Sequence, residues 1–259
     1  MHQHTTGRIH LQRQGAVAHL IIDHPGKRNA LTLEMWEGLP GLVAETDADK
    51  DIRIVVLEGA GENFAAGSDI SEFSKLRSTP DDIARYNTIS SLAVHSLLSL
   101  SKPLVARIKG SCVGAGMALA VHCDLRYATE DAQFSIPAGK LGIGYRHLWV
   151  QRLCALVGPA KAKEIMFSAG RYQAESALGM GLVNQLYDDE QFKQMLCTLC
   201  SMAPLSLAAS KVAIEQAISP YGYDHDRCAA AVQACFNSQD YIEGRAAFDE
   251  KRTPKFIGH

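Results

Sequence analysis

The chain has 259 residues, 47% of them hydrophobic, and a formal net charge of −2. A chain of this length and composition can bury a large core in one or two domains. The small net charge argues against a broad surface for nucleic acid or membrane, although a local basic pocket for a phosphorylated ligand stays open. No apolar run approaches the length of a transmembrane helix, and residues 1–6 are polar rather than signal-like. We therefore expect a cytoplasmic protein.

The seven cysteines are scattered along the chain. Cys197 and Cys200 have the spacing of a redox motif or of half a metal site, but no second cysteine pair completes a zinc set. Their stretch is apolar and helix-like, which favours ordinary thiols. We expect no metal site.

The first half of the chain alternates strand and helix patterns. Apolar runs and two-residue alternation predict strands at 8–14, 16–22, 52–57, 104–108, 125–128 and 133–135. Helical spacing predicts helices at 31–46, 86–100 and 116–122, whereas residues 71–89 are expected to be irregular or partly helical.

The second half is nearly all helical in pattern. Its predicted helices span residues 149–157, 160–168, 174–180, 188–203, 205–218 and 225–248. Alternating elements followed by a run of helices favour an α/β core with a helical C-terminal region.

Two glycine-containing segments each join a predicted strand to a helix-like stretch. They are Phe64-Ala-Ala-Gly-Ser-Asp-Ile70 and Gly110-Ser-Cys-Val-Gly-Ala-Gly-Met117. Small residues let a ligand approach the backbone, and a helix that begins there has N–H groups without an internal partner. Two such turns side by side would aim two donors at one oxygen. That arrangement is an oxyanion hole, which can stabilise a thioester enolate.

These two segments resemble those of the crotonase (enoyl-CoA hydratase/isomerase) superfamily. The resemblance is carried, in family order, by residues 23–31, 64–73, 102–124, 132–142, 177–184 and 251–258. It implies a ββα-spiral core with the acyl-CoA site over residues 1–200, and a helical trimerisation region over 201–259. It also implies a homotrimer, or a hexamer formed from paired trimers.

By the same resemblance, the oxyanion donors are the backbone N–H groups of Ser68 and Ala115. Hydratases of the family carry two glutamates that work across the double bond, and the matching positions here are Ala118 and Ala138. An acid or base contributes about 10²–10⁴-fold each. The sequence therefore predicts little hydratase activity. His122, four residues after Ala118, is expected to be a core histidine, with a role at the floor of the site as the alternative.

Other candidate catalytic groups lie in the loop 141–147, which borders the acyl pocket in the superfamily. Tyr145 matches a tyrosine that helps hold the substrate carboxylate in the methylmalonyl-CoA decarboxylase branch. Arg146 replaces an acid of dienoyl-CoA isomerases and could bind a carboxylate through two N–H groups. His147 could act as an acid or base. Packing, interface and helix-capping roles stay open for the three, and Ser68 stands where the decarboxylase branch has histidine.

The resemblance also places the substrate. Lys27, Arg28 and Ala30 are expected near the nucleotide, and a cation there suits the phosphates. The remaining expected contacts to the ligand are Ala66, Ser68, Asp69, Ile70, Gly114, Ala118, Ala138, Lys255 and Phe256, and the last two could close the nucleotide site from a neighbouring subunit. Coenzyme A enters as part of the substrate, so no separate cofactor is expected.

The resulting hypothesis is an enzyme that stabilises a thioester enolate, within fatty acid metabolism. A decarboxylase-type lyase is preferred, because loss of CO₂ generates the enolate without a glutamate base. An isomerase, a hydrolase or a residual hydratase is the alternative. A protein that binds acyl-CoA without turnover belongs to a different class and also fits the two alanines.

Overall fold

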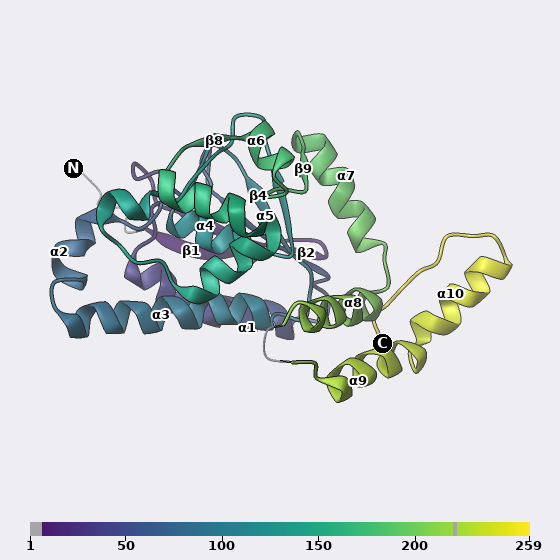
Figure 1. Ribbon diagram of the computed structural model, residues 1–259. Coiled ribbons are helices and arrows are strands. Elements are labelled where there is room, and N and C mark those ends of the chain that lie inside the picture. The colour runs from purple at the N-terminus through teal and green to yellow at the C-terminus, as the bar shows by residue number, and fades with distance from the viewer. Residues whose placement is uncertain (1–6, 220–221) are drawn as a thin grey trace, which may run out of the picture.

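The computed structural model describes residues 7–219 and 222–259 (Figure 1). The strands are β1 (Arg8–Gln14), β2 (Val17–Asp23), β3 (Ile54–Gly59), β4 (Leu104–Ile108), β5 (Ser111–Val113), β6 (Leu125–Ala128), β7 (Gln133–Ser135), β8 (Tyr172–Gln173) and β9 (Gln185–Leu186). The helices are α1 (Leu33–Ala48), α2 (Phe73–Leu76), α3 (Pro80–Ser99), α4 (Ala115–Val121), α5 (His147–Ser168), α6 (Ala174–Gly179), α7 (Asp189–Cys200), α8 (Pro204–Ala217), α9 (His225–Phe236) and α10 (Gln239–Asp249). Two short 3-10 helices are η1 (Ile70–Glu72) and η2 (Pro137–Leu141).

The main sheet has the strand order β1-β2-β3-β4-β6-β9, and a second sheet has the order β5-β7-β8. Strands β1 and β2 are antiparallel, whereas the other neighbours in the main sheet are parallel. Residues 54–57 of β3 are all buried because helices cover both faces of this part of the sheet. Val55 and Leu57 face the main core, while Ile54 and Val56 pack against α7. The expected α/β class is confirmed.

Helices α1 and α3 run side by side beneath the sheet in Figure 1. Residues 71–89 were expected to be irregular or partly helical, and they are partly helical, but α3 begins at Pro80, six residues before the predicted helix start at Tyr86. Thr79 caps this helix, accepting a hydrogen bond from the N–H of Asp82 while the Asp82 carboxylate accepts from Thr79. Proline suits the first helical position, where its missing N–H costs nothing. Pro80 therefore starts the helix.

The helix predicted over residues 225–248 is two helices in the structure. Helix α9 ends at Phe236, and the hydroxyl of Ser238 accepts a hydrogen bond from the N–H of Tyr241 at 3.1 Å, which starts α10 in a new direction. Helices α8, α9 and α10 extend beyond the edge of the α/β core in Figure 1. Among the described residues, no single helix has the length and apolar content to cross a membrane. Helices α7 and α8 meet both criteria only as a pair that is bent by 99°.

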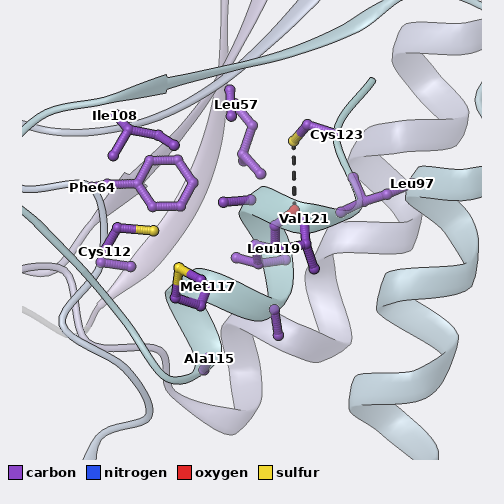
Figure 2. Close-up of a cluster of buried hydrophobic side chains, with 14 of the residues drawn as sticks. Leu57, Phe64, Leu97, Ile108, Cys112, Ala115, Met117, Leu119, Val121 and Cys123 are labelled. Carbon is purple, nitrogen blue, oxygen red and sulfur yellow. Dashed lines mark hydrogen bonds between the residues drawn. The ribbon is translucent and has the colours of Figure 1, made fainter. Parts of the chain in front are cut away.

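Helix α4 lies in the middle of the core. All seven of its residues are buried, and Figure 2 shows apolar side chains around it from β3, β4, β5 and α3. Leu119 and Val121 lie within this cluster, and Ala115 stands at the first turn of the helix. Close packing on every side fixes the helix, so the position of its first N–H groups is fixed with it.

Candidate active site

The first glycine turn is held by backbone hydrogen bonds to the segment before α1. The N–H of Leu31 donates to the carbonyl of Gly67 at 2.7 Å, and the N–H of Asp69 donates to the carbonyl of Leu31 at 2.8 Å. Gly67 has a φ of 113°, which side chains rarely allow. This path leaves the N–H of Ser68 between two paired groups, without a backbone partner in the part of the chain that the structure describes.

The second turn leads from β5 into α4. Gly114 has a φ of 52°, and its N–H donates to the carbonyl of Ser135 at 2.9 Å. Ala115 follows as the first residue of the helix, where the N–H has no acceptor within the helix. Gly116 is required by close packing, since a Cβ atom there would lie 2.5 Å from the carbonyl oxygen of Ala65.

The two turns touch each other, although they lie almost fifty residues apart in the chain. Ala65 and Cys112 form a parallel bridge between them. A Cβ atom on Gly67 would lie 3.4 Å from the carbonyl oxygen of Val113. In residues 7–219 and 222–259, no hydrogen bond uses the N–H of Ser68 or Ala115 as its donor. The arrangement therefore has two free donors beside one cavity, as an oxyanion hole requires.

The cavity next to these donors is mostly apolar. It is lined by Ala66, Gly67, Ser68, Ile70, Phe73, Arg77, Tyr86, Asn87, Val113, Gly114, Ala115, Pro137, Ala138, Leu141, Ile143, Gly144, Tyr145, Arg146 and Trp149. No Asp, Glu or His side chain is among these lining residues. Within the described ranges, no group of three or more His, Cys, Asp or Glu side chains could hold a metal ion.

Tyr145 lies in the wall of the cavity. Its hydroxyl donates to the carbonyl of Gly114 at 2.6 Å, and its ring meets Trp149 edge to face at 5.2 Å between centroids. Burial raises the pKa of Tyr145, so the hydroxyl stays protonated. A phenol hydroxyl has one O–H donor, and here that donor is hydrogen-bonded to the Gly114 carbonyl. Tyr145 therefore fixes the second turn and has no proton left to offer a substrate carboxylate.

Arg146 is held by neutral groups. Its guanidinium donates to the Asn87 carbonyl at 2.7 Å, the Ser91 hydroxyl at 2.7 Å and the Ser90 hydroxyl at 2.6 Å. It also lies over the Trp149 ring, with its Cζ 4.6 Å from the centroid. No carboxylate pairs with it in the described part of the chain. Burial lowers the pKa of Arg146, but a guanidinium still keeps its charge near neutral pH.

Tyr86 is a site residue that the sequence did not indicate. Its hydroxyl receives the indole N–H of Trp36 at 3.0 Å and lies 3.1 Å from the Ser68 hydroxyl. Helix α3 thus supports the first turn directly. A weak signal was available, since Tyr86 and Ser90 are polar, four residues apart and buried on one face of α3. Arg77, in the segment expected to be irregular or partly helical, was missed as well.

The two alanines at the expected glutamate positions lie in different places. Ala138 lines the cavity, whereas Ala118 is buried inside α4. His122 donates through its Nδ1–H to the carbonyl of Ala118 at 2.6 Å, and its Nε2 is buried without a partner among the described residues. Burial lowers the pKa of His122 to about 4. His122 is therefore a neutral core residue, outside the cavity lining.

The remaining expected residues divide between the site and other surfaces. Lys27 Nζ lies 3.4 Å from the Asp69 carboxylate, at the exposed side of the first turn. Arg28 and Ala30 belong to the same segment, and Ile70 lies at the cavity rim. Eight expected residues do not line the cavity, namely Lys27, Arg28, Ala30, Asp69, Ala118, His147, Lys255 and Phe256. His147 is exposed at the start of α5, the Lys255 N–H donates to Glu243, and Phe256 packs near Gly244.

Two free N–H donors over an apolar cavity in a mixed α/β fold are what an enzyme needs to stabilise an oxyanion, the class of site expected from the sequence. The family model described as enoyl-CoA hydratase/isomerase matches residues 12–259. The chain belongs to this family, a part of the crotonase superfamily, and the expected superfamily is confirmed.

Relatives within the family are named for different reactions. The chain is 32% identical to a short-chain-enoyl-CoA hydratase of Clostridium acetobutylicum over 93% of this chain and 94% of that protein. It is 28% identical to a peroxisomal Delta(3,5)-Delta(2,4)-dienoyl-CoA isomerase of Arabidopsis thaliana, over 96% and 95%. The solved structure of an enoyl-CoA hydratase/carnithine racemase from Magnetospirillum magneticum has a TM-score of 0.89 and 32% identity, over 97% and 96%. Membership of the family therefore does not decide which reaction this chain catalyses.

Proposed function

We propose that this protein is a lyase that decarboxylates an acyl-CoA thioester carrying a second carboxylate. One observation carries the proposal: the cavity beside the two free N–H groups contains guanidinium groups but no carboxylate or imidazole. Breaking the bond between Cα and the carboxylate releases CO₂ and leaves its electron pair on the thioester as an enolate. This step needs stabilisation of an oxyanion and no base. The enolate then takes one proton at Cα from water.

Hydration and isomerisation fit the cavity less well. Both require a group that accepts or donates a proton at carbon or at water, and such a group contributes about 10²–10⁴-fold. Ala138 offers none at the cavity wall. The Tyr145 hydroxyl uses its one donor in a hydrogen bond to a carbonyl, and His147 lies outside the cavity. Isomerase, hydrolase and residual hydratase activity are therefore weaker alternatives.

In the proposed reaction, Arg146 would bind the carboxylate that leaves. The two terminal nitrogens of its guanidinium already donate four hydrogen bonds to Asn87, Ser90 and Ser91, so the Nε–H is the donor that remains and the attraction is mainly one of charge. The pairing is strongest before the bond breaks, because the negative charge then moves from the carboxylate to the thioester oxygen. Arg146 should therefore lower KM more than it raises kcat. The N–H groups of Ser68 and Ala115 act on the charge that develops, so they should raise kcat.

The test is a panel of malonyl-CoA, methylmalonyl-CoA and crotonyl-CoA with purified protein. Release of CO₂ and the shortened acyl-CoA are measured by chromatography, and in D₂O the product is expected to carry one new deuterium at Cα. Crotonyl-CoA hydration, followed by loss of thioester absorbance, is expected to be very slow. Two results together would contradict the proposal. They are crotonyl-CoA turnover within tenfold of a typical rate of roughly 10 s⁻¹, and no CO₂ from the other two substrates.

A second candidate function is binding of acyl-CoA without turnover. It is favoured by the same absence of an acid or base among the described lining residues. The panel separates the two, since tight binding with no product from any thioester would support the binder.

We also propose that the protein assembles as a homotrimer or as a hexamer of paired trimers. Large apolar side chains are exposed on the C-terminal elements, namely Val232, Phe236, Tyr241, Ile242, Phe248 and Ile257. A patch of this kind suggests a protein contact. Light scattering after size-exclusion chromatography tests the mass, and a monomer at micromolar concentration would contradict the assignment.

A further inference from the structure

We propose that Arg77 and Arg146 together form a subsite with two guanidinium groups, which binds a carboxylate on a short acyl group of the CoA ligand. This inference rests on the proposed function for the nature of the ligand as an acyl-CoA. It goes further by assigning a binding role to Arg77, on the segment between α2 and α3, and by limiting the length of the acyl group.

The side chain of Arg77 has no polar partner among the described residues. Its Cζ lies 3.9 Å from the ring centroid of Tyr86 and 4.1 Å from that of Phe73. Its Nε is buried and makes no hydrogen bond, and no ion pair involves Arg77 in the described part of the chain. Aromatic rings stabilise a cation without neutralising it. The full positive charge of Arg77 therefore remains at the cavity wall.

Arg146 brings a second positive charge to the same cavity. Its hydrogen-bond partners are a carbonyl, a side-chain amide oxygen and hydroxyls, all of them neutral. Burial is the main cause that lowers the pKa of Arg146, and the charge of Arg77 lowers it further. The two cations thus interact unfavourably across a partly desolvated space. No Asp or Glu lines this cavity to compensate them.

A carboxylate would compensate both charges at once. It has two oxygens and about four lone-pair directions, so it can accept from the N–H groups of Arg77 and from the Nε–H of Arg146, whose terminal nitrogens are engaged with Asn87, Ser90 and Ser91. The structure also limits where this carboxylate sits. Arg77 stacks on the Tyr86 ring, and the hydroxyl of that ring lies 3.1 Å from the Ser68 hydroxyl. Arg77 and the first oxyanion turn thus contact the same tyrosine, which favours a carboxylate a few atoms from the thioester carbon.

Two CoA thioethers test this subsite without any chemistry. S-carboxyethyl-CoA carries a carboxylate, and S-carbamoylethyl-CoA carries an amide of the same shape. Neither has a thioester carbonyl, so neither can be decarboxylated. Calorimetry with the wild type should give a preference of about tenfold or more for the carboxylate, since hydrogen bonds to a charged group contribute about 1.5–3 kcal/mol. Higher salt should reduce this preference.

The variants separate a binding role from a packing role. Arg77→Gln should reduce the preference for the carboxylate at least about fivefold, while amide binding changes less than about twofold. Arg77→Lys keeps the positive charge but lacks the paired N–H donors of a guanidinium. Its preference for the carboxylate should therefore lie between those of the wild type and Arg77→Gln. Arg85→Gln is the matched control, because Arg85 is exposed on α3 and pairs with Glu37 at 3.1 Å. It should bind both ligands like the wild type.

Three results would overturn the inference. The first is equal affinity of the wild type for the two CoA thioethers. The second is an equal loss of affinity for both of them in Arg77→Gln. The third is a loss of the carboxylate preference in Arg146→Gln but not in Arg77→Gln. An equal loss would make Arg77 a packing residue that holds the α2–α3 segment. Free malonate that binds as tightly as S-carboxyethyl-CoA would remove the acyl assignment. A carboxylate preference together with no CO₂ from malonyl-CoA keeps the subsite and contradicts only the proposed reaction. If Arg77→Gln fails to fold, Arg77→Lys carries the test.

Discussion

Replacing Ala115 with proline removes one oxyanion donor and little else. Ala115 is the first residue of α4, and its N–H donates to no acceptor in the described part of the chain. Proline is well tolerated at this helical position because that N–H is unpaired anyway. The free energy of unfolding should therefore change by about 1 kcal/mol or less. Removing one donor of an oxyanion hole costs about 10²–10³ in kcat, or about 2.7–4 kcal/mol.

Two readouts follow this variant. The first is kcat for the substrate that the panel identifies, measured beside the free energy of unfolding in urea. The second is the absorbance of a bound dienoyl-CoA, because a conjugated thioester shifts to longer wavelength when two N–H groups polarise its carbonyl. The proline variant should lose most of the shift. Ala115→Gly is the control, since it keeps the N–H and should keep both signals within a few-fold. A folded proline variant with more than one tenth of wild-type turnover and an unchanged shift would refute the placement of the hole.

Two further predictions concern stability. Burial lowers the pKa of His122 to about 4, so the unfolded chain binds more protons as the pH falls below 6.5. The contribution of neutral His122 to the free energy of unfolding should be fully present well above pH 6.5. The free energy of unfolding should then fall by about 2 kcal/mol by pH 5. In His122→Gln this pH dependence should be absent in urea unfolding curves, and an unchanged dependence would contradict it. Gly116→Ala should lower the melting temperature, because its Cβ would lie 2.5 Å from the Ala65 carbonyl oxygen, whereas Gly38→Ala, with open space around it, should raise it slightly. Equal shifts would contradict the packing argument.

Features that depend on local spacing could be predicted from the sequence. The alternation in residues 16–22 and the apolar run at 52–57 gave the central strands, because side chains alternate across a sheet and a covered parallel strand is apolar throughout. The pattern of residues 225–248, in contrast, fitted one helix. The capping hydrogen bond of Ser238 ended it, since a cap depends on the local backbone and not on apolar periodicity.

The sequence by itself determined the α/β core, the two glycine turns and the family. Those features come from short segments whose side chains and backbone angles act locally. Only the tertiary structure decided how the polar groups are used. In the folded chain, the Tyr145 hydroxyl donates its hydrogen bond to Gly114, His147 lies outside the cavity, and Arg77 packs against the ring of Tyr86. Each of these outcomes depends on contacts between segments that the chain brings together only when its core closes, and no local pattern encodes such a contact.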